Sequence, residues 1–208
     1  RSAADLGLNL VAVGLRYRHG YFHQVVINGK QVAAYTDTDP AHLPMDPVVD
    51  ADGKRVQVEI PYGSGVLHAQ AWVVHINKVK LFLLDTDLPE NAPELRALTH
   101  QLYGGDQRMR LGQEVLLGIG GRRLLKALDI PVEVYHLNEG HAAFLVLQLW
   151  SEEMARGTKP AQALKNVKQQ CVFTTHTPVP AGHDCFYWDD LNAILGPWRD
   201  QLGLSRGT

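Results

Sequence analysis

The sequence is poor in the features that mark several classes of protein. It contains only two cysteines, Cys171 and Cys185, so no disulfide framework is expected and a reducing cytoplasm is the default location. No apolar run reaches the roughly 18–20 residues that a membrane span needs, and the start of the chain lacks a secretory signal. The net charge of −2 gives no electrostatic reason to expect nucleic acid or a membrane surface as a partner.

What is present is the composition of an ordinary globular protein. Hydrophobic residues make up 45% and charged residues 20% of the 208 positions. This length suits one sizeable domain, or two only if both are small. We expect one α/β domain of Rossmann type, with a β-rich subdomain at residues 24–84 and an α/β portion at residues 93–208.

The first half of the chain has patterns typical of strands. Asn28-Gly29 is a strong hairpin signal, because both central positions of such a turn must accept a positive φ. Apolar residues alternate with polar ones around Val58, as they do in a half-buried strand. Strands are predicted at residues 24–27, 31–35, 56–60, 66–76 and 79–84.

The second half alternates helical patterns with short apolar runs. Helices are predicted at residues 93–103, 108–128, 139–154, 161–167 and 189–202, the last of them interrupted at Gly196-Pro197, and strands at residues 131–137 and 172–175. This alternation predicts a parallel sheet with helical crossovers. In such sheets the working residues follow the carboxyl ends of the strands, which directs attention to residues 136–141 and 175–184.

The segment at residues 136–141 (HLNEGH) concentrates polar groups where a strand should turn into a helix. Asn138 suits a helix cap and Glu139 suits the positive end of a helix, so helix capping alone would explain both. His136 and His141 raise the alternative of a metal site. They are five positions apart rather than the four of a helical HExxH site, and we predict no metal.

The segment at residues 174–184 (TTHTPVPAGHD) is the most unusual stretch of the chain. Its prolines and glycine stiffen it, while its hydroxyl groups and histidines offer the hydrogen bonds that a sugar ring needs. The alternative is a rigid connector with solvated side chains. A hydrolytic triad is disfavoured, because no serine or cysteine lies in a GxSxG context. The glycines at 118–121 follow no strand, so they favour close helix packing or a kink over a phosphate loop.

Several blocks, in order, resemble those of one family. The similar segments are residues 15–24 with Gly29 (LRYRHGYFHQ…NG), 83–91 (LLDTDLPEN), 102–121 (LYGGDQRMRLGQEVLLGIGG), 137–144 (LNEGHAAF) and 172–184 (VFTTHTPVPAGHD). They resemble the α-glucan phosphorylases, in particular the short bacterial and archaeal form. The resemblance covers nearly the whole chain and implies part of the N-terminal half of a GT-B glycosyltransferase fold, whose active site lies between two Rossmann-like halves.

The resemblance also implies a reaction and its partners. Inorganic phosphate would attack terminal α-1,4-linked units of glycogen, starch or maltodextrin and release glucose 1-phosphate. Pyridoxal phosphate would sit on a lysine of the C-terminal half and act through its own phosphate group. The full-length protein would be a cytoplasmic enzyme, and a homo-oligomer is possible for it.

Site residues follow from the same resemblance. His176 resembles the histidine that binds the transferred glucosyl unit, and Thr175 belongs to the same loop, which would clamp the sugar. The glucan side of the site would include Asn138, Glu139 and His141. The substrate gate would comprise Gly104, Gly105 and Asp106, with Arg110 on the helix just beyond.

The resemblance further implies missing parts. The glycine-rich phosphate loop would lie just before Ser2, and the C-terminal half would carry the cofactor lysine and the basic groups around the phosphate. We therefore expect no pyridoxal phosphate and no turnover from this chain alone, together with an exposed, unpaired apolar face. The alternatives are a stand-alone glucan-binding or regulatory module and, fitting the blocks less well, a nucleotide-sugar glycosyltransferase.

Overall fold

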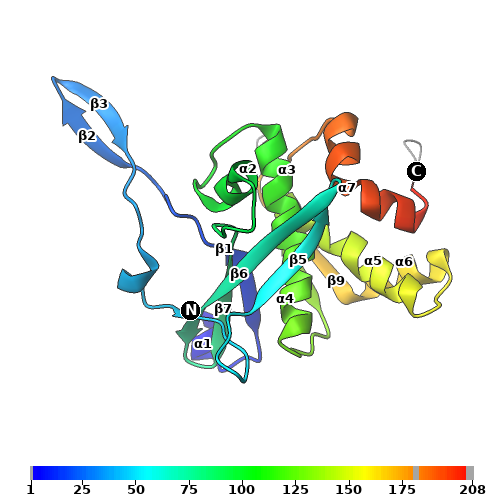
Figure 1. Cartoon of the computed structure of the whole chain (residues 1–208). Coiled ribbons are helices and arrows are strands. Elements are labelled where there is room, and N and C mark those ends of the chain that lie inside the picture. Colours follow the sequence, from blue (N-terminus) through cyan, green and yellow to red (C-terminus); the bar gives the residue numbers. More distant parts are fainter. Residues whose placement is uncertain (1, 180–182, 205–208) are drawn as a thin grey trace. The chain divides into compact units, whose positions relative to one another are not determined.

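The computed structural model describes residues 2–179 and 183–204 (Figure 1). The chain divides into two compact units. The first comprises the chain up to Val56 together with Ala69–Gly105, and the second comprises Gln57–His68 together with the chain from Asp106 onward. Within the described ranges, no helix is both long enough and apolar enough to span a membrane.

The first unit is built around strands. Its elements are α1 (Ser2–Asp5), β1 (Val11–Leu15), β2 (His23–Ile27), β3 (Lys30–Ala34), the 3-10 helix η1 (Pro40–His42), β4 (Asp46–Pro47), most of β6 (Gly65–Ile76), β7 (Val79–Asp85), α2 (Pro93–Arg96) and the 3-10 helix η2 (Ala97–Thr99). Strand β1 pairs with β7 in parallel, β7 pairs with β6 antiparallel, and β6 pairs with β4 antiparallel. The predicted turn between β6 and β7 is confirmed, with Asn77 at φ 53°.

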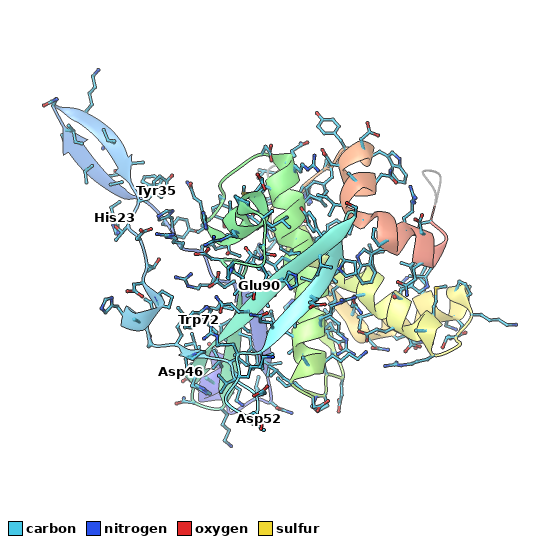
Figure 2. All side chains as sticks on the ribbon, viewed as in Figure 1. His23, Tyr35, Asp46, Asp52, Trp72 and Glu90 are labelled. Carbon is cyan, nitrogen blue, oxygen red and sulfur yellow. The ribbon has the colours of Figure 1, made fainter. Side chains whose placement is uncertain are left out.

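The predicted hairpin is also confirmed. Asn28 (φ 50°) and Gly29 (φ 74°) join β2 to β3, as the favoured two-residue turn requires. Val25 lies opposite Val32 on one face of the hairpin, and both are exposed. His23 and Tyr35 are labelled near the base of the hairpin in Figure 2, where the chain enters and leaves it. An isolated two-stranded hairpin is only marginally stable in water, and these exposed valines add apolar surface to it. The unpaired apolar face expected of this chain stays a prediction.

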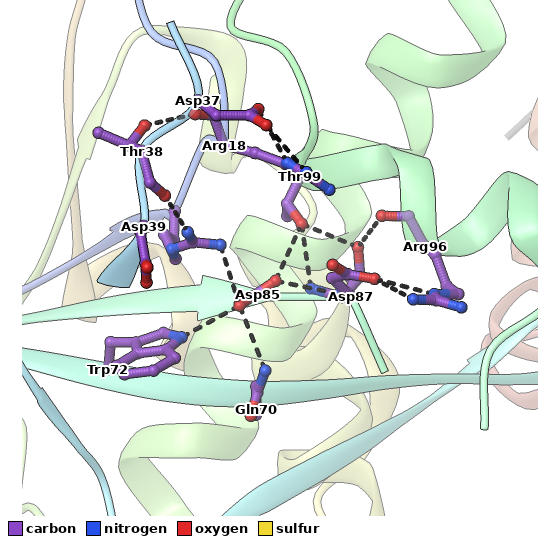
Figure 3. Close-up of polar contacts among 12 residues, drawn as sticks. Arg18, Asp37, Thr38, Asp39, Gln70, Trp72, Asp85, Asp87, Arg96 and Thr99 are labelled. Atoms are coloured by element: carbon purple, nitrogen blue, oxygen red, sulfur yellow. Dashed lines mark hydrogen bonds and ion pairs between the residues drawn. The ribbon is translucent and has the colours of Figure 1, made fainter. Parts of the chain in front are cut away.

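A buried carboxylate at the end of β7 ties the first unit together (Figure 3). The side chain of Asp85 is 3% exposed, and its oxygens accept hydrogen bonds from Trp72 Nε1 at 3.0 Å and Gln70 Nε2 at 3.2 Å. They also accept bonds from Thr99 Oγ1 at 3.3 Å and from the guanidinium of Arg16 at 3.4 Å. Because a buried charge persists only when it is paired, this one residue holds β1, β6, β7 and η2 in place.

The second unit has the alternating order expected of an α/β fold. Its elements are β5 (Gln57–Tyr62), the start of β6, α3 (Gln107–Val115), the π-helical turn η3 (Leu116–Gly120), α4 (Gly121–Ala127), β8 (Tyr135–Asn138), the 3-10 helix η4 (Gly140–Ala142), α5 (Leu145–Ala155), α6 (Pro160–Gln170), β9 (Cys171–Thr174) and α7 (Trp188–Leu202). Strand β5 pairs with β6, and β8 pairs in parallel with β9. The mixed α/β class with parallel strands is therefore confirmed.

Several predicted boundaries were wrong. The helix expected at 93–103 ends at Arg96 and continues as η2, because the hydroxyl of Thr99 is drawn into bonds with Asp85 and with the Thr86 amide. The strand expected from residue 131 begins only at Tyr135. Glu139, at φ 60°, turns the chain, so α5 starts at Leu145 rather than at residue 139. Finally, α7 runs without interruption through Pro197.

The glycine-rich stretch at 118–121 serves close packing, as one of the two interpretations predicted. Gly118 lies in η3 against the start of α5, where a Cβ atom would come within 2.5 Å of the Leu145 amide nitrogen. The same Cβ would lie 2.9 Å from the carbonyl carbon of Phe144. Both neighbours are backbone atoms, so neither can rotate away. The fully buried side chains of Leu116 and Ile119 on the same turn complete the core at this crossing.

We predict that Gly118→Ala lowers the free energy of unfolding by about 1–3 kcal/mol, because the added methyl group forces α5 away from η3. Gly140→Ala is the matched control, since nothing lies within 4 Å of its Cβ position and its φ is not positive. The control should be neutral or stabilising by about 0.4–1 kcal/mol. Urea unfolding followed by circular dichroism measures both. Equal effects of the two substitutions would contradict the packing explanation.

Candidate functional site

The candidate site lies where the two parallel strands of the second unit end. Asn138 of β8 lies opposite Thr174 of β9, and the chain leaves both strands at the same edge. His136 Nε2 is 2.7 Å from Thr174 Oγ1, a bond that links the strands at this edge. The two segments singled out in the sequence are thus neighbours in space, as the strand pattern predicted. Pro180, Ala181 and Gly182 of the second segment lie outside the described residues.

Glu139 connects the two segments. Its side chain is 4% exposed, and Oε1 accepts the backbone N–H groups of His176 at 2.7 Å and Thr177 at 2.8 Å. These bonds, that of the His176 N–H above all, lower the pKa of Glu139 to about 2 against the opposing effect of burial. The hydroxyl groups of Thr177 and Thr175 lower it further. The other carboxylate oxygen, Oε2, is buried without a partner among the described residues.

His176 is held through both ring nitrogens. Nδ1 lies 3.2 Å from Glu139 Oε1 and Nε2 lies 2.9 Å from Asn138 Oδ1, while 57% of the side chain stays exposed. The capping explanation for Asn138 and Glu139 was therefore wrong. Glu139 makes no side-chain bond to the helical turn that it precedes, and it binds the backbone of the neighbouring loop instead. Its positive φ, rare outside glycine, is of the kind found where a surrounding site holds the backbone.

A second polar cluster adjoins the first through residues 138–141. Arg110 and Glu114 lie one turn apart on α3, His141 belongs to η4, and Asp184 lies in the connection between β9 and α7. Arg110 Nη2 is 2.9 Å from Asp184 Oδ2, 3.3 Å from His141 Nδ1 and 3.9 Å from Glu114 Oε1. Because a guanidinium only donates, a hydrogen bond between Arg110 and His141 requires Nδ1 of the histidine to accept.

Glu114 and Asp184 are site residues that the sequence analysis did not assign. The pKa of Glu114 is raised to about 8, first by burial and then by the hydrogen bond with Asp184 and its negative charge. Burial raises the pKa of Asp184, but the hydrogen bonds with Glu114 and Arg110 outweigh this effect and lower the pKa overall. Two adjacent carboxyl groups cannot both stay ionised cheaply, so the buried one keeps the proton. The i, i+4 spacing of Arg110 and Glu114 was the available sequence signal.

One atom each of Glu114, His141 and Asp184 lies within 4.8 Å of the others, a grouping that could hold a metal ion. The guanidinium of Arg110 already lies among these atoms and supplies the cation. His136, the other histidine considered for a metal, is engaged by Thr174 instead. The geometry therefore favours an arginine-centred cluster over a metal centre.

The predicted gate residues occupy a turn ahead of α3. Gly105 has φ 84°, a value that favours glycine, and follows Tyr103, which is also at positive φ. Asp106 caps α3 by accepting the Met109 N–H at 2.9 Å. A mobile gate here stays a prediction, whereas Arg110 lies on the helix just beyond, as expected.

Two cavities lie elsewhere. One of about 380 Å³ is lined by Tyr135, the first residue of β8, and by the Arg122–Glu152 ion pair, so it faces the opposite end of that strand. The other, of about 430 Å³, lies in the first unit beside Asp85 and Trp72. Its strongest polar groups already bond to one another in the network of Figure 3.

The chain is similar to known proteins along nearly all of its length. It is 44% identical over 203 residues, 97% of the chain, to a maltodextrin phosphorylase of Thermococcus litoralis. It is 47% identical over 99% of its length to a glycogen phosphorylase of Mycobacterium tuberculosis, and 32% identical over 86% to one of Aquifex aeolicus. The chain spans only 24–26% of the length of these relatives. No family model matches it.

We predict that Glu139→Gln destabilises the protein at neutral pH and that the difference from wild type disappears in acid. The folded state lowers the pKa of Glu139 from 4.5 to about 2, so the carboxylate stabilises the fold above pH 4.5. That contribution is lost as pH falls from about 4.5 to about 2. Thermal melts at a series of pH values measure it. Exposed Glu133→Gln is the control, and a pH-independent difference for Glu139→Gln would contradict the role of the charge.

Proposed function

We propose that this chain, which belongs to the family of the glycogen and maltodextrin phosphorylases, forms the glucan-binding and glucosyl-binding part of an α-1,4-glucan phosphorylase. The whole enzyme would use inorganic phosphate to cleave terminal α-1,4-linked glucosyl units and release glucose 1-phosphate. One observation carries the proposal. Glu139 accepts the backbone N–H groups of His176 and Thr177, and this contact between two segments that resemble the family supports one shared site.

The geometry suits a sugar clamp. The amide of Asn138 and the carboxylate of Glu139 hold the exposed imidazole of His176, the hydroxyl group of Thr175 bonds to Glu139, and Glu139 Oε2 has no donor among the described residues. A sugar hydroxyl group is a suitable donor for such an oxygen. Both nitrogens of His176 are engaged, so a sugar would either pack on the open ring face or replace Asn138 at Nε2. Polar groups that are already positioned before the sugar binds can stabilise the transition state more than the substrate.

The described residues hold no cluster that matches the phosphate side of the reaction. Every lysine is exposed, so none is placed in the shielded pocket where a cofactor Schiff base would form. Arg110, the arginine nearest the site, is already paired with Asp184. The residues present thus do not fit pyridoxal phosphate. We assign the cofactor, its lysine and the substrate phosphate to polypeptide outside this chain.

The finer fold is proposed on the same basis. We assign residues 93–208 to the α/β portion of the N-terminal half of a GT-B fold and residues 24–84 to a β-rich subdomain. The pair β8–β9 would belong to its Rossmann-like sheet. Gly104, Gly105 and Asp106 would form the gate beside Arg110. The partners would be glycogen, starch or maltodextrin in the cytoplasm, with no nucleic acid and no membrane, and the full-length enzyme would be a possible homo-oligomer.

A second candidate, a stand-alone glucan-binding or regulatory module, has one observation in its favour. The sugar-side groups are gathered in the second unit, whereas the described residues hold no matching phosphate-side cluster. Such a module would bind maltodextrin without turnover and without any dependence on phosphate. The experiment that follows separates the two.

In the full-length parent polypeptide, we predict phosphate-dependent release of glucose 1-phosphate from maltodextrin. His176→Ala should lower kcat/KM by roughly five- to 160-fold, equivalent to about 1–3 kcal/mol of transition-state stabilisation. His75→Ala, at an exposed position on β6, is the matched control and should leave the rate unchanged. Maltodextrin binding without release, with or without phosphate, would replace the enzyme proposal with the module.

A further inference from the structure

The connection between β9 and α7 carries both His176 and Asp184, and Glu114 lies beside Asp184 on α3. We propose that Glu114 is a positioning residue of the glucan site: its neutral carboxyl group donates a hydrogen bond to Asp184 and so fastens the connection that bears His176 to α3. That the site binds glucan rests on the proposed function. The hydrogen bond from Glu114 to Asp184 does not depend on it. Neither Glu114 nor Asp184 would touch the reacting atoms.

Three segments meet at this point. Arg110 and Glu114 come from α3, His141 from η4, and Asp184 from the connection that leads into α7. Arg110 Nη1 is anchored on the buried Gln113 at 3.1 Å, so its other nitrogen is directed at Asp184 from a fixed support. The Glu114 side chain is 4% exposed and its Oε1 has no hydrogen-bond donor among the described residues. A buried oxygen without a donor is costly for a carboxylate and much less so for a neutral acid.

The charges around Glu114 support the neutral form. Arg110 and Asp184 form an ion pair at 2.9 Å, and His141 Nδ1 lies 3.9 Å from Glu114 Oε1 and 3.8 Å from Asp184 Oδ2. An ionised Glu114 would add a second negative charge beside a guanidinium that is already paired with Asp184 and lies 3.9 Å from Glu114. Nearby, Arg108 of α3 and Asp190 of α7 pair with each other at 3.9 Å. The raised pKa of Glu114, about 8, is in accord with this geometry.

Loss of this proton would convert an attraction into a repulsion. Below about pH 8 the neutral acid bridges to Asp184, and above it two carboxylates face one another across a single guanidinium. Asp184 would then part from α3, which removes one support of the site that contains Thr177 and His176. Those two residues stay bound to Glu139, whose low pKa keeps it ionised throughout this range. The clamp would loosen but not unfold.

The first test uses this chain without any sugar. The folded pKa of Glu114 lies above the unfolded one, so stability should fall as pH rises from about 4.5 to about 8. Glu114→Gln keeps a neutral donor toward Asp184 and should remove this contribution, which is at most tenfold in the unfolding constant per pH unit. Glu153→Gln, which removes a carboxylate bound by Asn166, is the matched control and should keep the wild-type slope. A slope unchanged in Glu114→Gln would overturn the inference.

The second test follows the proton and the loop directly. The carboxyl carbon of Glu114, observed by NMR, should titrate near pH 8, and the amide signals of His176 and Thr177 should shift with the same midpoint. In Glu114→Gln these amide shifts should be absent. A Glu114 midpoint near its ordinary value of 4.5 would overturn the positioning role, and so would amide signals of His176 and Thr177 that do not change during the Glu114 titration.

The third test adds maltoheptaose and separates the two proposals. Wild-type affinity should fall up to about tenfold per pH unit above pH 8, and that of Glu114→Gln should stay level. Equal pH dependence in both proteins would overturn the positioning role and leave the glucan function standing. Absence of binding at every pH, with the titration and loop shifts as expected, would overturn the glucan function for this chain and leave the fastening intact.

Discussion

The candidate site depends on one buried carboxylate that must find donors. The charged carboxylate of Glu139 is buried in the second unit. The backbone N–H groups of His176 and Thr177 donate the hydrogen bonds that water would otherwise provide. Those donors come from the chain that leaves β9, so the bonds form only when β8 and β9 pair in parallel with Asn138 opposite Thr174. The positive φ of Glu139 is held by these same contacts. The register of β8 and β9, the path of the chain after β9 and the orientation of His176 therefore depend on one another.

Two glutamates of the same site end in opposite protonation states, and their surroundings decide which. Glu139 meets two backbone donors and stays ionised far below its usual range. Glu114 meets a second carboxylate in a buried position and keeps its proton near neutral pH. In the first unit, the buried carboxylate of Asp85 accepts hydrogen bonds from neutral donors and from one arginine. The groups around a carboxyl group therefore set its protonation state and its role.

Prediction from the sequence succeeded where local chemistry decides the outcome. The Asn28-Gly29 turn, the Asn77 turn and the alternating strands were all recognisable, because positive φ and period-two burial depend on near neighbours. Prediction failed where a distant partner intervenes. Thr99 ends α2 early through its bonds to residues after β7, and Glu139 delays α5 by turning toward the loop after β9. Helical spacing holds no information about either contact.

The sequence by itself indicated the resemblance to the phosphorylases, the α/β class and the two segments that lie together in the candidate site, because blocks of residues and strand order are properties of the chain alone. It also supplied His176, Asn138 and Glu139 as candidates. Only the tertiary structure decided that Glu139 binds a loop rather than caps a helix, and that the buried Glu114 lies beside Asp184 and Arg110. The reason is physical. Burial and the positions of partners far along the chain set protonation and hydrogen bonding, and both arise only on folding.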